Sequence, residues 1–327
     1  MDVTRSEFED LVGAYALDAC DAEEARAIDA YIAQHADAAA EAERLRGAAA
    51  WLGAAGALHP PVSLRDRLLA VAAERVEPVA PVEALLRETA RFEALLDTVT
   101  DPDLDTVTFN GLSVRDLVAH VAIVDEDFVA AAHADSAVFI GAERVLAVTE
   151  AHLPETAGQP FREIRERLRR ARASLVALDG DLPATARVGG YSLSSVLVIR
   201  AFETWTHCGD IAASLGRDIA PAEGPVLRTM AELAVQTLPL ALGAKGYAFP
   251  GRTARVVVSG AGGGDWTIAC GGEPAGASPD VILRVPIFEF CQRFAERVGV
   301  DDVPFEIEGD VELGRALLDA APAFAGL

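Results

Sequence analysis

One predicted helix, residues 191–216, carries ionisable side chains on a largely apolar surface. Ser192 can cap its N-terminus, and Gly216 can end it in a left-handed conformation. Glu203 and His207 are four residues apart and therefore lie on the same face of the helix. The neighbouring positions are apolar, so we expect much of the helix to be buried: Leu193, Leu197, Ile199, Phe202 and Ile211.

A buried Glu and a buried His are costly unless something pairs with them. A divalent metal would do so, because carboxylate oxygen and imidazole nitrogen are common zinc ligands. A hydrogen bond between Glu203 and His207 would also do so. On this helix alone, the hydrogen bond is the simpler interpretation.

A second predicted helix supplies another buried histidine. Ser113 and Asp116 form a variant of the capping box at its start. His120 then falls among apolar residues on the face that must pack inward. A lone histidine in this position is usually a satisfied core residue, but here it can meet the Glu and His of the other helix. Three protein ligands with a fourth position left open are typical of a catalytic zinc.

The segments Gly111–His120 and Phe202–Asp210 resemble the mycothiol-dependent maleylpyruvate isomerase family, which belongs to the DinB-like metal-binding four-helix bundles. The resemblance implies that His120, Glu203 and His207 bind zinc or a similar divalent metal, with mycothiol as co-substrate. In that family's reaction the thiolate adds to the cis double bond of maleylpyruvate, and rotation and elimination then give fumarylpyruvate.

Two further residues on the 191–216 helix are candidates for a catalytic role. Arg200 lies one turn before Glu203 and could meet a substrate carboxylate. Asp210 lies one turn after His207 and could orient its imidazole ring. Either residue could instead pair with a neighbouring helix. Cys208 points about 100° away from His207 and is not expected to be a ligand.

Composition limits the partners and the compartment. The chain has 51 acidic and 28 basic residues, a formal charge of −23, which disfavours nucleic acid as a partner. It has no apolar run long enough to cross a membrane and no signal-peptide pattern, so we expect a cytoplasmic protein. Four scattered cysteines do not suggest disulfides or a thiolate metal site. The abundance of alanine and arginine beside one lysine resembles proteins of high-GC actinobacteria, where mycothiol is the common thiol.

The predicted fold is mainly α, with a small helical module (1–76), a metal-binding up-and-down four-helix bundle (82–220) and a C-terminal α+β domain (221–327). Bundle helices are expected near 82–99, 114–134, 161–178 and 191–216. His133 and His152 would lie in or near the long link between the second and third of these. Short β runs are expected near 254–259, 265–270, 280–285 and 304–308. This last part resembles the sterol-carrier-like domain that follows the isomerase bundle.

The N-terminal module resembles the N-terminal domain of anti-sigma factors in its patterning. The zinc-binding members carry a His and two Cys after the second helix, where this chain has Tyr31, His35 and Ala38. We therefore expect no zinc there, and a surface position for His35. A sigma factor is the partner that this resemblance implies for residues 1–76.

Three functions follow from these observations. The first is a zinc- and mycothiol-dependent isomerase or thiol transferase that acts on a small electrophile such as maleylpyruvate. The second is an anti-sigma-like regulator that senses thiol or metal status through the bundle. The third is a binding module that keeps the metal but has lost turnover.

Overall fold

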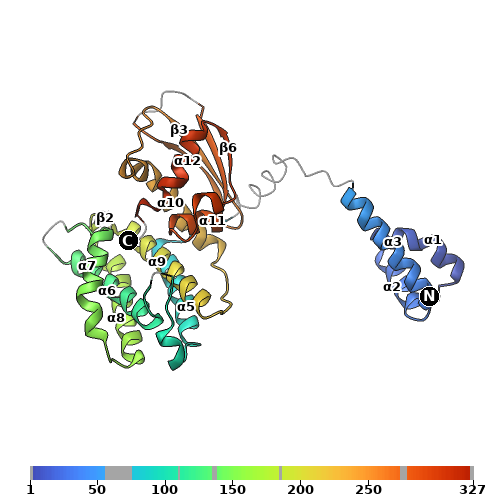
Figure 1. Ribbon diagram of the computed structural model, residues 1–327, viewed down its shortest axis with the longest axis horizontal. Helices are drawn as coiled ribbons and strands as arrows, with labels where there is room; N and C mark the ends of the chain where they lie inside the picture. The colour runs from blue at the N-terminus through green and yellow to red at the C-terminus, as the bar shows by residue number, and fades with distance from the viewer. Residues whose placement is uncertain are drawn as a thin grey trace. The chain divides into compact units, whose positions relative to one another are not determined.

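The computed structural model describes residues 3–55, 76–109, 111–134, 138–183, 186–272 and 278–324. The chain divides into two compact units, Met1–Arg65 and Asp66–Leu327 (Figure 1).

The N-terminal unit contains α1 (Arg5–Ala16), α2 (Ala22–Ile32) and α3 (Ala36–Ala55). Capping boxes at Thr4 and Asp21 begin the first two helices, since each side chain accepts a backbone N–H that the helix leaves free. Phe8, Val12 and Ile28 are buried in its small core. His35 is exposed, as expected, and its ring stacks on Tyr31 with the centroids 4.1 Å apart.

The second unit begins with a four-helix bundle formed by α5 (Pro81–Leu96), α6 (Val114–Ala132), α8 (Phe161–Asp181) and α9 (Leu193–Ser214). Helix α6 packs on α8, and α5 packs on α9 (Figure 1). The predicted caps are confirmed, because Ser113 accepts from the Asp116 N–H and Ser192 accepts from the Ser195 N–H. Gly216, at φ +60°, follows the end of α9 as expected.

The segment between α6 and α8 is not only a link. It contains α7 (Ala142–His152), which packs against α6, and a 3₁₀ turn over Leu153–Thr156. The sequence did not predict this helix, and His152 is its last residue. A two-stranded hairpin, β1 (Arg187–Val188) and β2 (Tyr191–Ser192), then leads into α9.

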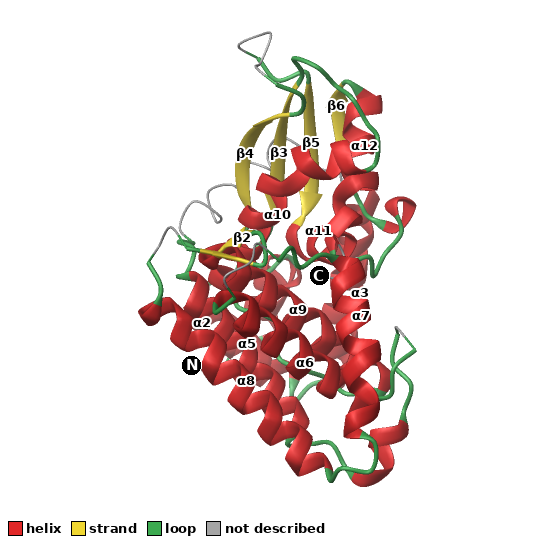
Figure 2. Ribbon diagram, turned by 90° about the vertical axis from the view of Figure 1, so that its left-hand side faces the viewer, coloured by secondary structure: helices red, strands yellow, loops and turns green. Residues whose placement is uncertain are grey.

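The C-terminal part is α+β, as predicted. Its sheet has the order β4-β3-β5-β6, with β3 (Thr253–Ser259), β4 (Gly264–Ala269), β5 (Val281–Pro286) and β6 (Glu306–Gly309). Strands β3 and β5 are parallel, and the two outer pairs are antiparallel. Helices α10 (Gly224–Ala244), α11 (Ile287–Phe294) and α12 (Val311–Ala320) pack against this sheet (Figure 2). Alternate residues of β3 and β5 are buried, which is the period expected of a sheet with one covered face.

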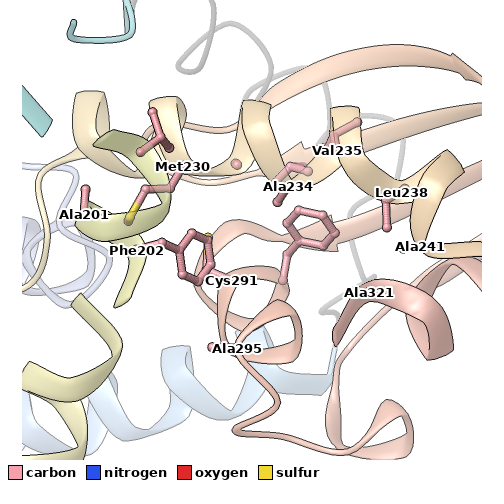
Figure 3. Close-up of a cluster of buried hydrophobic side chains, with 14 of the residues drawn as sticks. Ala201, Phe202, Met230, Ala234, Val235, Leu238, Ala241, Cys291, Ala295 and Ala321 are labelled. Atoms are coloured by element: carbon pink, nitrogen blue, oxygen red, sulfur yellow. The ribbon is translucent and has the colours of Figure 1, made fainter. Parts of the chain in front are cut away.

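The bundle and the α+β part share one continuous core. Ala201 and Phe202 of α9 lie close to Met230 and Ala234 of α10 and to Cys291 of α11 (Figure 3). Burying one side chain of the size of Phe202 stabilises a fold by about 1.5–3 kcal/mol. This core fixes α9, the helix that carries two of the candidate ligands, against the C-terminal part. None of the helices in the described ranges is long and apolar enough to cross a membrane.

Candidate metal centre

Three candidate ligands meet where α6 and α9 face each other. His120 comes from α6, and Glu203 and His207 come from α9. One potential ligand atom from each residue lies within 4.8 Å of the others, a set that could hold a metal ion. The two imidazole rings are perpendicular, with their centroids 5.4 Å apart. His207 Nε2 lies 3.1 Å from Glu203 Oε2, yet it is buried and has no hydrogen-bond partner within the described part of the chain.

The hydrogen bonds around the two histidines indicate their tautomers. The Thr149 hydroxyl donates to the Val145 carbonyl at 2.7 Å, so its oxygen accepts from His120 Nδ1, 2.8 Å away. Asp210 Oδ2 accepts from His207 Nδ1 at 3.1 Å. Each ring therefore donates from Nδ1, which leaves Nε2 as the nitrogen that can bind a metal, the arrangement seen in metal-binding histidines.

Burial and the neighbouring charges set the protonation of these groups. Burial and, to a smaller extent, the nearby His207 lower the pKa of His120 to about 3, so His120 is neutral at physiological pH. Burial alone would lower the pKa of His207, but its hydrogen bond to Asp210 and the nearby Glu203 carboxylate outweigh this and raise the pKa. Burial would raise the pKa of Glu203, but His207 outweighs it and the pKa is lowered. Glu203 is therefore an anionic donor beside two imidazoles.

Asp210 joins the ligand helix to the C-terminal part of the unit. Arg297, which follows α11, donates from Nε and Nη2 to the two oxygens of Asp210, both at 2.8 Å. Asp210 is only 6% exposed. Bidentate pairs of this kind fix geometry as well as adding energy. Asp210, which accepts a hydrogen bond from His207, is therefore held in place by Arg297 of the C-terminal part.

The three candidate ligands line a cavity of about 990 Å³. Its wall comes from the loop before α6, from α7, from the β1–β2 hairpin, from α9 and α10, and from residues 294–297 after α11. A position that the protein leaves open on the metal would therefore face a space large enough for small-molecule ligands.

Arg200 and Cys208 lie away from this cavity. Arg200 is fully buried, and its Nε donates to Asp125 Oδ1 at 2.7 Å. Arg200 is not among the described residues of the cavity wall. This position does not favour the contact with a substrate carboxylate that the sequence suggested, and that contact stays a prediction. Cys208 is buried in the apolar core of the bundle, and burial raises its pKa to about 11.

Comparison with known proteins identifies the bundle. Residues 85–212 match the family described as the mycothiol maleylpyruvate isomerase N-terminal domain, and this segment contains all three candidate ligands. The four-helix bundle belongs to this family. Two crystal structures, of the mycothiol-dependent maleylpyruvate isomerase and of a mutant of it, are similar to the chain at 15% and 14% identity with TM-scores of 0.45 and 0.44. Each covers 69% of this chain and 91% of its own. No curated protein matches the chain.

The matched family is named after a mycothiol-using maleylpyruvate isomerase, and the matched segment of this chain contains the three residues that could hold a metal ion. The match begins at residue 85, so the anti-sigma-like interpretation of residues 1–76 and its sigma-factor partner stay predictions.

Sequence reasoning missed two residues of the candidate metal centre, Thr149 and Arg297. Thr149 lies on the unpredicted helix α7, and Arg297 is 87 residues from Asp210. No local pattern marks either residue, because each reaches the site only through tertiary packing.

Proposed function

We propose that this chain is a metal-dependent enzyme that adds a thiol, with mycothiol as the natural one, to a small electrophile. The observation that supports this is the cluster of His120, Glu203 and His207 at the wall of a cavity of about 990 Å³. Both an isomerase of the maleylpyruvate type and a thiol transferase fit this description. Maleylpyruvate is the first electrophile to assay, because the family acts on it.

The donor set fits zinc. Two imidazoles and one carboxylate match the three-ligand pattern of catalytic zinc sites. The buried Nε2 of His207, which lacks a hydrogen-bond partner among the described residues, is the kind of atom that a metal would satisfy. Zinc, when bound, would act as a Lewis acid that lowers the pKa of a coordinating thiol, so that the thiol is deprotonated at neutral pH.

The other residues of the site position these ligands. Thr149 and Asp210 keep the Nδ1 proton on each imidazole and so fix the ring orientations. Arg297 holds Asp210 in place through two hydrogen bonds. In an isomerisation the thiol sulfur adds to one carbon of a cis double bond, the new single bond rotates, and elimination returns the thiol.

A matched pair of histidine variants tests the proposal. His120→Ala removes a ligand, whereas His152→Ala removes an exposed histidine of α7 that is not in the cluster. We expect the wild-type protein and His152→Ala to bind one zinc per chain and to consume maleylpyruvate, or another electrophile of a small panel, only when mycothiol is present. We expect His120→Ala to lose both properties.

Full zinc content in His120→Ala would refute the proposed metal site. Zinc binding without any thiol-dependent turnover would refute the proposed enzymatic function. If residues 1–76 then captured a sigma factor, the regulatory interpretation would replace it.

A further inference from the structure

Four large apolar side chains are exposed to solvent along one cavity wall. They come from different parts of the chain and are each between 62% and 69% exposed: Phe109, Phe139, Leu146 and Leu240. Two of them lie on helices α7 and α10, and two lie on loops. Scattered apolar residues on a surface need no explanation, but a group gathered around one opening marks a site for an apolar ligand.

The position of Phe139 in this group is fixed by the backbone around it. A Cβ atom added to Gly141 would lie 2.7 Å from the Phe139 ring, and one added to Gly190 would lie 2.6 Å from it. Both distances are too short for a real contact, so a side chain at either position would displace the ring from this place. The ring also packs against Tyr191, with the centroids 5.5 Å apart. The aromatic edge of the cavity is therefore a built feature of the hairpin and the loop before α7.

The charged groups of the wall offer little to an anionic substrate. The described wall residues include two arginines, Arg187 and Arg297, and two glutamates, Glu203 and Glu296, so their formal charges cancel. Every side-chain nitrogen of Arg297 already donates, to Asp210 or to the Ala295 carbonyl. Arg187 is exposed on the hairpin and donates to the Gly190 carbonyl. Among the described wall residues, this leaves Arg187, at the exposed hairpin, and the metal itself as the cations that a small dicarboxylate could meet.

Two hydroxyl groups of the wall are satisfied within the protein, whereas the buried Tyr191 hydroxyl has no partner among the described residues. The Ser195 hydroxyl shares a hydrogen bond with Ser192 at 2.7 Å. The Thr237 hydroxyl donates to the Ala234 carbonyl at 2.8 Å. A ligand in the cavity therefore meets mainly hydrocarbon surface outside the metal cluster.

We infer that the electrophile is an uncharged α,β-unsaturated ketone or aldehyde with an extended alkyl chain, which lies along Phe139, Leu146 and Leu240. This inference rests on the proposed function, which supplies the thiol. The sulfur forms a bond to the β-carbon, and the π electrons of the double bond move toward the carbonyl group. The proton that the thiol released ends on the α-carbon. Atoms and electrons balance without an oxidant or a further reactant.

Binding of unreactive analogues tests the inference without turnover. Isothermal titration calorimetry on the zinc-loaded protein, with no thiol present, would compare the saturated ketones from 2-hexanone to 2-decanone with maleate. We expect the affinity to rise about fourfold for each added methylene, because each CH₂ leaves water for an apolar wall. We expect maleate to bind more weakly than 2-decanone.

A pair of leucine variants locates the alkyl chain. Leu146→Glu places a charge on the wall, whereas Leu86→Glu places one at an exposed position of α5 outside it. We expect 2-decanone to bind at least tenfold more weakly to Leu146→Glu and unchanged to Leu86→Glu. Circular dichroism would establish that both variants fold.

A flat chain-length series, or tighter binding of maleate than of 2-decanone, would overturn the inference. Equal binding of 2-decanone to the two leucine variants would do the same. A normal chain-length series in a protein that shows no thiol-dependent turnover would instead count against the proposed function alone.

Discussion

Replacing Asp210 by Asn changes one charge at the point where the metal cluster meets the C-terminal part. The amide is nearly the same size as the carboxylate, so the packing around it should be kept. The variant nevertheless weakens two contacts, the acceptor for His207 Nδ1 and the anionic partner of Arg297. Both effects can be measured separately.

The expected loss of metal affinity follows from the contact with His207. Replacing the carboxylate that orients a metal-binding histidine typically lowers metal affinity by about 10–100-fold. This corresponds to about 1.4–2.7 kcal/mol. We expect Asp210→Asn to fall in this range, because Asp210 Oδ2 accepts directly from the ring nitrogen at 3.1 Å.

The expected loss of stability follows from the contact with Arg297. Breaking a fully buried ion pair by removing one partner costs about 3–5 kcal/mol. The Arg297 side chain is 19% exposed, so water offsets part of this cost. We therefore expect the metal-free variant to lose about 2–3 kcal/mol in the free energy of unfolding.

A chelator competition titration would measure the zinc dissociation constant, and urea unfolding of the metal-free protein would measure stability. Asp218→Asn is the matched control, because this aspartate is exposed and four residues from the end of α9. An Asp210→Asn variant that binds zinc as tightly as Asp218→Asn would refute the role assigned to Asp210. Unchanged stability would refute the linking role of Arg297.

Three further predictions follow from the same geometry. Thr149→Val should weaken zinc binding by roughly tenfold because His120 loses its acceptor, while Thr149→Ser should restore it; equal affinities would show that the hydroxyl does not matter. A thiol reagent at pH 8 should label at most one cysteine of the native protein, because burial raises the pKa of Cys208, Cys270 and Cys291 to about 11 or 12. Rapid labelling of any of these three cysteines would contradict their packing. A chain that begins at residue 76 should fold and bind zinc, because residues 66–327 form their own compact unit. Circular dichroism and metal analysis would check this, and aggregation or metal loss would mean that the N-terminal helices are needed.

Helical periodicity was sufficient to predict the contacts within one helix. Glu203, His207 and Asp210 are three or four residues apart, so their common face follows from 3.6 residues per turn. The capping residues Ser113 and Ser192 were predictable for a similar reason, because their partners lie three residues ahead.

Periodicity does not show how deep a face lies in the fold. Arg200 shares the stripe of Glu203, but the structure buries it fully against Asp125 of α6. Helix α7 escaped prediction because Gly141 stands at its start, where a capping side chain would have marked it. Thr149 and Arg297 reach the site only after α7 and the C-terminal half have packed, and no local pattern encodes that packing.

X-ray absorption at the zinc edge, with and without mycothiol, tests the central proposal most directly. The loaded protein without thiol should show only nitrogen and oxygen neighbours at about 2.0–2.2 Å, from two imidazoles, a carboxylate and a solvent molecule. Addition of mycothiol should bring one sulfur neighbour at about 2.3 Å. A spectrum that shows sulfur before the thiol is added, or none after it, would contradict a site formed by His120, Glu203 and His207 that activates a thiol.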